Sequence, residues 1–194
     1  MVVVVVVVLL SRGGPSSGPT PTFPPFPSPT ADSKALAPAG TPSGQPIDGI
    51  ECHTAEQLAY HIHAHLAVLV NGAAAVIPEG IGVTPPRHEV LTDAGWFVES
   101  GKCFYLLHTH TADGVIHVEA PSQTVYNLGQ FFDIWGQPLT ATQVGPATGS
   151  VIAYVNGVKF NGDPRTITIN KYDVIQLDVG TDAPPQTFQF PPGL

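Results

Sequence analysis

The sequence predicts a mainly β fold of the α+β class, built from antiparallel hairpins with one helix packed on the sheet. Three observations support this prediction. Asn-Gly or Asp-Gly dipeptides at 71–72, 113–114 and 156–157 separate short apolar runs, and such dipeptides favour two-residue hairpin turns. The segment 60–70 alternates between two faces with the period of a β-strand. One segment, 127–135, carries a helical stripe of large apolar residues.

Length and charge limit the classes of partner. The chain has 194 residues, enough for one domain of ordinary size, which we place at 51–180. Seven Lys and Arg stand against fifteen Asp and Glu, giving a formal net charge of −8. Without a basic surface, the chain is not expected to bind nucleic acid.

Both ends of the chain differ in composition from this domain. Residues 1–10 are an apolar run about half as long as a membrane-spanning helix needs, so we interpret them as the remnant of a signal peptide or membrane anchor. A buried strand is the alternative. Residues 11–50 are rich in Pro, Ser and Gly and predict a disordered linker, and 181–194 form a Pro-rich tail. These features predict an extracytoplasmic protein, secreted or anchored at a membrane, whose protein partner is not identified by the sequence.

The strand at 60–70 carries histidines on one face only. His61, His63 and His65 occupy odd positions, whereas the even positions are apolar throughout. The outer two histidines stand about 13 Å apart along a strand, which is too far for both to bind one ion comfortably. Two of the three can therefore complete a neighbouring metal site, or the strand can hold a second ion. The alternative is a set of surface or core histidines.

The segment 107–120 predicts the main site. With a type I′ turn at Asp113-Gly114, His110 lies opposite His117 and His108 lies opposite Glu119. Opposed Cβ atoms are about 5 Å apart, so three imidazoles and a carboxylate share one face. This set suits copper or zinc, with iron and manganese as alternatives. A polar face whose histidines hydrogen-bond one another is the competing interpretation.

The two cysteines, Cys52 and Cys103, each precede a histidine-bearing segment. A disulfide at the base of the site is favoured in an oxidising compartment, and thiolate ligation or two free thiols are the alternatives.

The other segments complete the predicted sheet and its cover. Residues 78–101 contain several Pro and Gly and predict a long loop, in which His88 is solvated. In the helix at 127–135, Asn127 caps the first turn with Gln130, and Gly136 ends the last turn. A further hairpin joins 151–155 to 158–160, and a β-sandwich is the expected packing of these strands.

Several of these elements together, HIHAHLAVLVNG, LLHTH, GVIHVEAP, LGQFFDIWG and VNGVKFNGDPR, are similar to those of a little-described group of bacterial and archaeal proteins. The resemblance covers 52–180 and implies an exported or membrane-anchored domain, but no established activity. The pattern of the group has an acidic residue directly after His-Thr-His. Here Thr111 takes that place and Asp113 follows two residues later.

Three functions remain open on the sequence. The first is extracytoplasmic binding, delivery or sequestration of a transition metal through His108, His110 and His117, with Glu119 and the strand of His61, His63 and His65 as ligands or supporting groups. The second is a metalloenzyme in which three histidines leave an open position and Glu119 acts as ligand or general base. The third is a structural module without metal. No nucleophile triad, phosphate-binding loop or dinucleotide fingerprint is present in the sequence.

Overall fold

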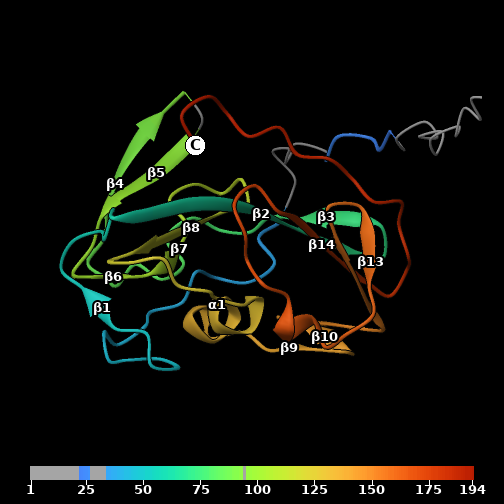
Figure 1. Ribbon diagram of the computed structural model, residues 1–194, viewed down its shortest axis with the longest axis horizontal. Helices are drawn as coiled ribbons and strands as arrows, with labels where there is room; N and C mark the ends of the chain where they lie inside the picture. The colour runs from blue at the N-terminus through green and yellow to red at the C-terminus, as the bar shows by residue number, and fades with distance from the viewer. Residues whose placement is uncertain (1–21, 27–33, 94) are drawn as a thin grey trace, which may run out of the picture.

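The computed structural model describes residues 22–26, 34–93 and 95–194, and the predicted signal or anchor remnant at 1–10 lies outside them. A seven-stranded sheet forms the middle layer (Figure 1). Its strands run in the order β13 (Val158–Phe160), β12 (Val151–Val155), β14 (Val174–Val179), β2 (Tyr60–Val70), β8 (Val115–Ala120) and β7 (Leu107–His108), and β3 (Ala73–Ala75) also pairs with β2.

The predicted Asn-Gly hairpins are confirmed. Asn71 and Asn156 adopt the positive φ of 51° that a type I′ turn needs, and they join β2 to β3 and β12 to β13. Most pairs in this sheet are antiparallel, but β14 lies parallel to β2 over six residue pairs. This non-local pairing places β2 at the centre of the sheet, between β14 and β8.

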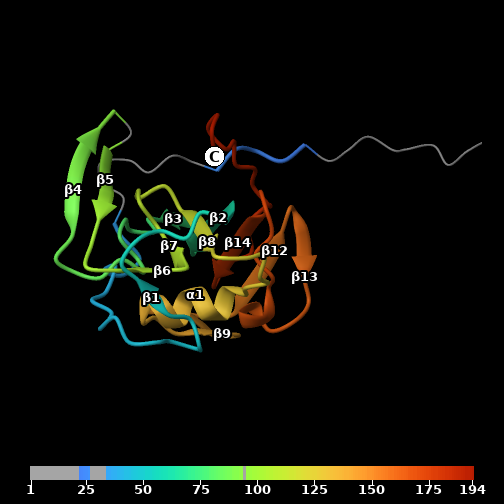
Figure 2. The same ribbon diagram turned by 60° about the vertical axis from the view of Figure 1, so that its left-hand side comes forward.

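The two faces of β2 meet different surroundings. Its even positions, such as Leu66, join the main core with the aromatic residues of α1 (Leu128–Trp135), which lies against one face of the sheet (Figures 1 and 2). The core also contains Leu36, Ala37 and Ile50, so the folded part begins before residue 51 and the stretch 34–50 is not a disordered linker.

Helix α1 has the predicted caps. The Asn127 side chain accepts from the Gln130 backbone N–H, the Gln130 side chain accepts from the Asn127 backbone N–H, and Gly136 ends the helix with φ 73°. The stripe of Phe131, Phe132 and Trp135 is buried, as its spacing predicts.

Smaller sheets surround this body. They are β1 (Cys52–His53) with β6 (Phe104–Tyr105), the trio β9 (Leu139–Thr140), β10 (Gln143–Val144) and β11 (Ala147–Thr148), and the hairpin β4 (His88–Thr92) with β5 (Gly95–Ser100). A short 3₁₀ helix, η1, spans Pro164–Thr166. The second layer is therefore α1 with a small sheet. The expected β-sandwich would have a second full sheet in this position.

The hairpin β4–β5 corrects the prediction of a loop over 78–101. It projects from one end of the molecule in both views (Figures 1 and 2). The apolar residues on either side of Asp93 and Gly95 pair with one another, and the sequence prediction gave too much weight to the surrounding Pro and Gly residues.

The Pro-rich tail crosses the face of the sheet opposite α1 (Figure 1). It pairs with the N-terminal segment 22–26, where the Phe26 N–H donates to the Thr187 carbonyl at 2.7 Å. No helix in the described part of the chain is long and apolar enough to cross a membrane.

Candidate metal centre

Three neighbouring strands bring histidines into a row. His63 of β2 pairs with His117 of β8, and His117 pairs with His108 of β7. One step along the strands, His61 of β2 pairs with Glu119 of β8. Directly paired residues lie on the same face of a sheet, so all five side chains share the face opposite α1.

The register of β7 and β8 differs from the prediction by two residues. His108 lies opposite His117, whereas the predicted partner of His117 was His110. Because side chains alternate with a period of two, a shift of two residues leaves every donor on its predicted face. The predicted site is therefore preserved despite the error in register. A shift of one residue would instead have placed the donors of the two strands on opposite faces.

The turn itself explains the shift. Asp113 does not have the positive φ that a type I′ turn requires, and its carboxylate instead accepts from the Val115 N–H at 2.9 Å. Gly114, with φ 79°, lies against β2, where its carbonyl accepts from the Leu66 N–H at 2.8 Å. Tertiary contacts with β2 thus replace the tight two-residue turn with a longer loop.

Two overlapping groups of side chains in the described part of the chain have the spacing to hold a metal ion. His108, His110, His117 and Glu119 form one group, and His61, His63 and His117 form the other. Within each group the donor atoms all lie within 4.8 Å of one another. The members of the first group are buried, and in the second group only His61 is exposed.

Backbone carbonyls fix the tautomers of two of these imidazoles. His108 Nδ1 is 2.9 Å from the Tyr105 carbonyl oxygen, and His110 Nδ1 is 2.6 Å from the Val98 carbonyl oxygen. A carbonyl only accepts, so each Nδ1 must carry a proton, and in the neutral form of either ring the lone pair is at Nε2. The two Nε2 atoms face each other at 3.1 Å, so in the neutral rings two lone pairs meet, and a cation bound to both would relieve that contact.

Glu119 is buried at the centre of the cluster. Its Oε1 lies 3.1 Å from His61 Nε2 and 3.6 Å from His117 Nδ1. Its Oε2 lies 3.8 Å from His108 Nε2, beyond hydrogen-bonding distance, and has no hydrogen-bond partner among the described residues. A buried carboxylate oxygen without a partner among the described residues, directed at an imidazole nitrogen, is suited to bind a cation.

Burial keeps the imidazoles of His63, His108 and His117 neutral. It lowers the pKa of His63 to about 4 and that of His117 to about 2, and it holds the pKa of His108 well below its usual range, with neighbouring imidazoles adding to each shift. Burial also raises the pKa of Glu119, an effect that His61 and His110 partly offset. At neutral pH these three histidines therefore present the unprotonated nitrogens that a metal ion requires.

A cavity of about 420 Å³ opens onto the cluster. It is lined by His61, His63, His110, His117 and Glu119, and also by Glu56, Phe97, Glu99, Gly193 and Leu194. The Phe97 ring of β5 stacks on His110 at 4.7 Å. The hairpin β4–β5 therefore forms one wall of the site, and its Val98 carbonyl orients a predicted ligand.

Glu56 was missed by the sequence analysis. Its Oε1 lies 3.3 Å from His110 Nε2, and burial raises its pKa. The segment 54–59 has no periodic pattern that would place it near 110. Its position three residues after His53 is a usable signal only once the pairing of β1 with β6 is known.

His65 lies outside both groups. Its Nε2 donates to the Asp113 carbonyl oxygen at 3.1 Å, and the Phe188 ring of the tail stacks on it at 3.7 Å. Burial lowers its pKa to about 4. Of the seven predicted site residues, the structure thus brings six together and places His65 under the tail, further along β2.

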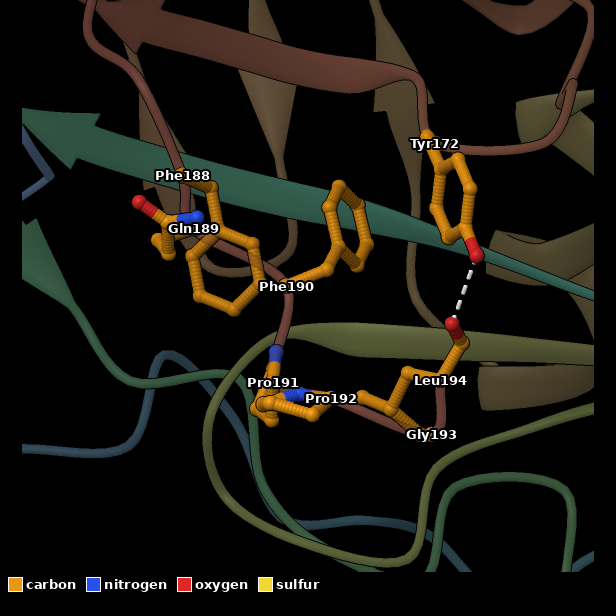
Figure 3. A pocket seen from close by; sticks show the side chains of 8 residues that line it. All are labelled: Tyr172, Phe188, Gln189, Phe190, Pro191, Pro192, Gly193 and Leu194. Carbon is orange, nitrogen blue, oxygen red and sulfur yellow. Dashed lines mark hydrogen bonds between the residues drawn. The ribbon is translucent and has the colours of Figure 1, made fainter.

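The tail lines a second hollow, which shares Gly193 and Leu194 with the cavity at the histidine cluster. Tyr172 and the segment 188–194 line a cavity of about 450 Å³ (Figure 3). The Tyr172 hydroxyl donates to the Leu194 carbonyl at 2.6 Å and so ties this segment to the body of the protein (Figure 3).

The favoured disulfide is present between Cys52 and Cys103, whose Cα atoms are 5.5 Å apart. It links the segments that carry Glu56 and Phe104. The Phe104 ring in turn packs on His108 with centroids 5.5 Å apart. The bridge therefore lies at the base of the site, as predicted, and thiolate ligation by these cysteines is excluded.

Comparisons with protein-family models, with curated proteins and with solved structures find no match to this chain. The resemblance drawn from the sequence elements remains a prediction.

Proposed function

We propose that this domain binds a transition-metal ion through His108, His110 and His117, with Glu119 as a fourth donor. Its role would be binding, delivery or sequestration of the metal outside the cytoplasm. The observation that carries the proposal is the contact between the two bare Nε2 atoms of His108 and His110 at 3.1 Å. Ligands bound to one ion at about 2.0–2.1 Å in a tetrahedral arrangement stand at a similar spacing, about 3.3–3.4 Å from each other.

The donor set favours copper or zinc. Three imidazoles and one carboxylate match the ligands of both ions, and the affinity order of divalent ions places copper first when the geometry allows it. Iron and manganese, which take more oxygen ligands, are the secondary candidates.

The extracytoplasmic location is supported by the disulfide, since such bridges persist mainly in oxidising compartments. An attachment to the membrane through residues 1–10 remains part of the proposal.

A metalloenzyme is the second candidate, and the cavity favours it. The hollow of about 420 Å³ beside the cluster has room for a small exogenous molecule next to the ion. Glu119, or Glu56 across His110, would then act as a general base toward a metal-bound water.

The first test is metal analysis of the purified full chain. The wild-type protein should retain copper or zinc through dialysis, and the triple variant His108→Ala/His110→Ala/His117→Ala should lose it. His88→Ala is the matched control, because exposed His88 pairs with Glu99 outside both groups. A folded triple variant that retains as much metal per chain as the wild type would exclude this site. Should that variant not fold, His110→Ala alone is expected to weaken binding at least tenfold.

The same sample separates the two candidates. Azide or cyanide should perturb the copper(II) spectrum of an enzyme with an open coordination position. A carrier should instead show a closed site that exchanges its metal with chelators.

A further inference from the structure

We propose that the cluster holds two metal ions, bridged by the Glu119 carboxylate. The first ion would be held by His108 and His110 and the second by His61 and His63, with His117 between them. This inference rests on the proposed function, because it adds a second ion to the same site.

The number of donors is the first argument. Seven side chains converge here: His61, His63, His108, His110, His117, Glu119 and Glu56. A zinc site uses four ligands, so this set exceeds what one such ion takes. Six of these donors also divide into two groups that share only His117, where a single centre would gather them into one group.

The orientation of Glu119 is the second argument. Its Oε1 faces His61 Nε2 at 3.1 Å, on the side of the second group. Its Oε2 faces His108 Nε2 at 3.8 Å, on the side of the first group. A carboxylate that directs one oxygen to each donor group has the geometry of a bridge between two ions, which in two-metal sites lie about 3.5–4 Å apart.

The remaining contacts agree with this division. His63 Nε2 lies 3.1 Å from His117 Nδ1, a donor pair on the second side. Glu56 Oε1 lies 3.3 Å from His110 Nε2, on the first side, where it can complete the ligands of that ion. The two carboxylates, Glu56 and Glu119, also offset part of the charge of two divalent ions.

Copper(II) is the probe for the test, because both its amount and its magnetic state can be measured. The full chain is stripped with a chelator, loaded with Cu²⁺ and dialysed, and copper per chain is compared with the number of spins from electron paramagnetic resonance. We expect two copper ions per chain and a spin count below the copper content, because a shared bridge couples the two ions.

Variants assign the second ion. His61→Ala/His63→Ala should bind one copper ion with a full spin count, whereas His88→Ala should behave as the wild type. His61→Ala alone is the safeguard against misfolding, since the His61 side chain is 36% exposed. It should weaken the second ion at least tenfold and leave the first bound.

Each outcome separates the hypotheses. One copper ion per wild-type chain overturns the second ion and leaves the proposed function intact, whereas no retained copper overturns both. Two ions with a full spin count overturn the bridge, because the ions would then be magnetically separate.

Discussion

The two faces of β2 show how one strand serves stability and chemistry at once. Residues on its even face, such as Leu66, pack into the apolar core with α1. Residues on its odd face, such as His63, meet other imidazoles and a carboxylate. The apolar face follows from the alternation within β2 alone. The histidine face forms a cluster of donors only together with the side chains of the strands beside it.

The largest expected effect is a loss of folding stability caused by a substitution on the apolar face of β2. Leu66 is 1% exposed, so Leu66→Ala should lower the free energy of unfolding by about 2–5 kcal/mol through lost burial and a new cavity. Urea denaturation of the metal-free protein measures this loss. Copper content per folded chain should stay that of the wild type, and a loss of copper from the folded variant would show that the two faces are not independent.

A smaller effect is the loss of folding stability in acid, which comes from the histidine face of β2. Burial lowers the pKa of His65 to about 4 in the folded chain, against about 6.5 unfolded. The unfolded chain therefore binds more protons between these values, and stability is lost as the pH falls from about 6.5 towards 4. His65 alone accounts for about 2 kcal/mol of this loss at pH 5.

Variants on the two faces of β2 test whether His65 causes this dependence of stability on pH. His65→Gln should reduce the slope of unfolding free energy against pH in the metal-free protein, whereas Leu66→Ala should lower the whole curve without changing its slope. Equal slopes in the wild type and His65→Gln would contradict the assignment of this acid sensitivity to His65.

The sequence predicts the local features of this fold and only part of the site. Capping by Asn127 and the turns at Asn71 and Asn156 depend on residues close in the chain, and all three are confirmed. The sequence also predicted that His108 and His117 share one face of the sheet. That prediction holds although the register was wrong, because a shift of two residues keeps each side chain on its face.

The rest of the site depends on contacts between distant segments. The row from His63 through His117 to His108 exists only because β2 lies beside β8, and no local pattern specifies that pairing. The same holds for Glu56, for the parallel pairing of β14 with β2, and for the tail over His65. That the histidines and Glu119 bind a metal remains a prediction.

The smallest expected effect extends the comparison to β5, which also has two unlike faces. Phe97 stacks on His110 at 4.7 Å, whereas Trp96, its neighbour in the chain, is 53% exposed. Phe97→Ala should remove a ring contact of about 0.5–1.5 kcal/mol and so weaken copper binding by about 2–13-fold, because His110 loses part of its orientation. Trp96→Ala is the matched control and should leave the affinity unchanged in a competition titration with a chelator. Equal affinities for both variants would mean that the Val98 carbonyl alone orients His110, and the hairpin would then serve the site through its backbone.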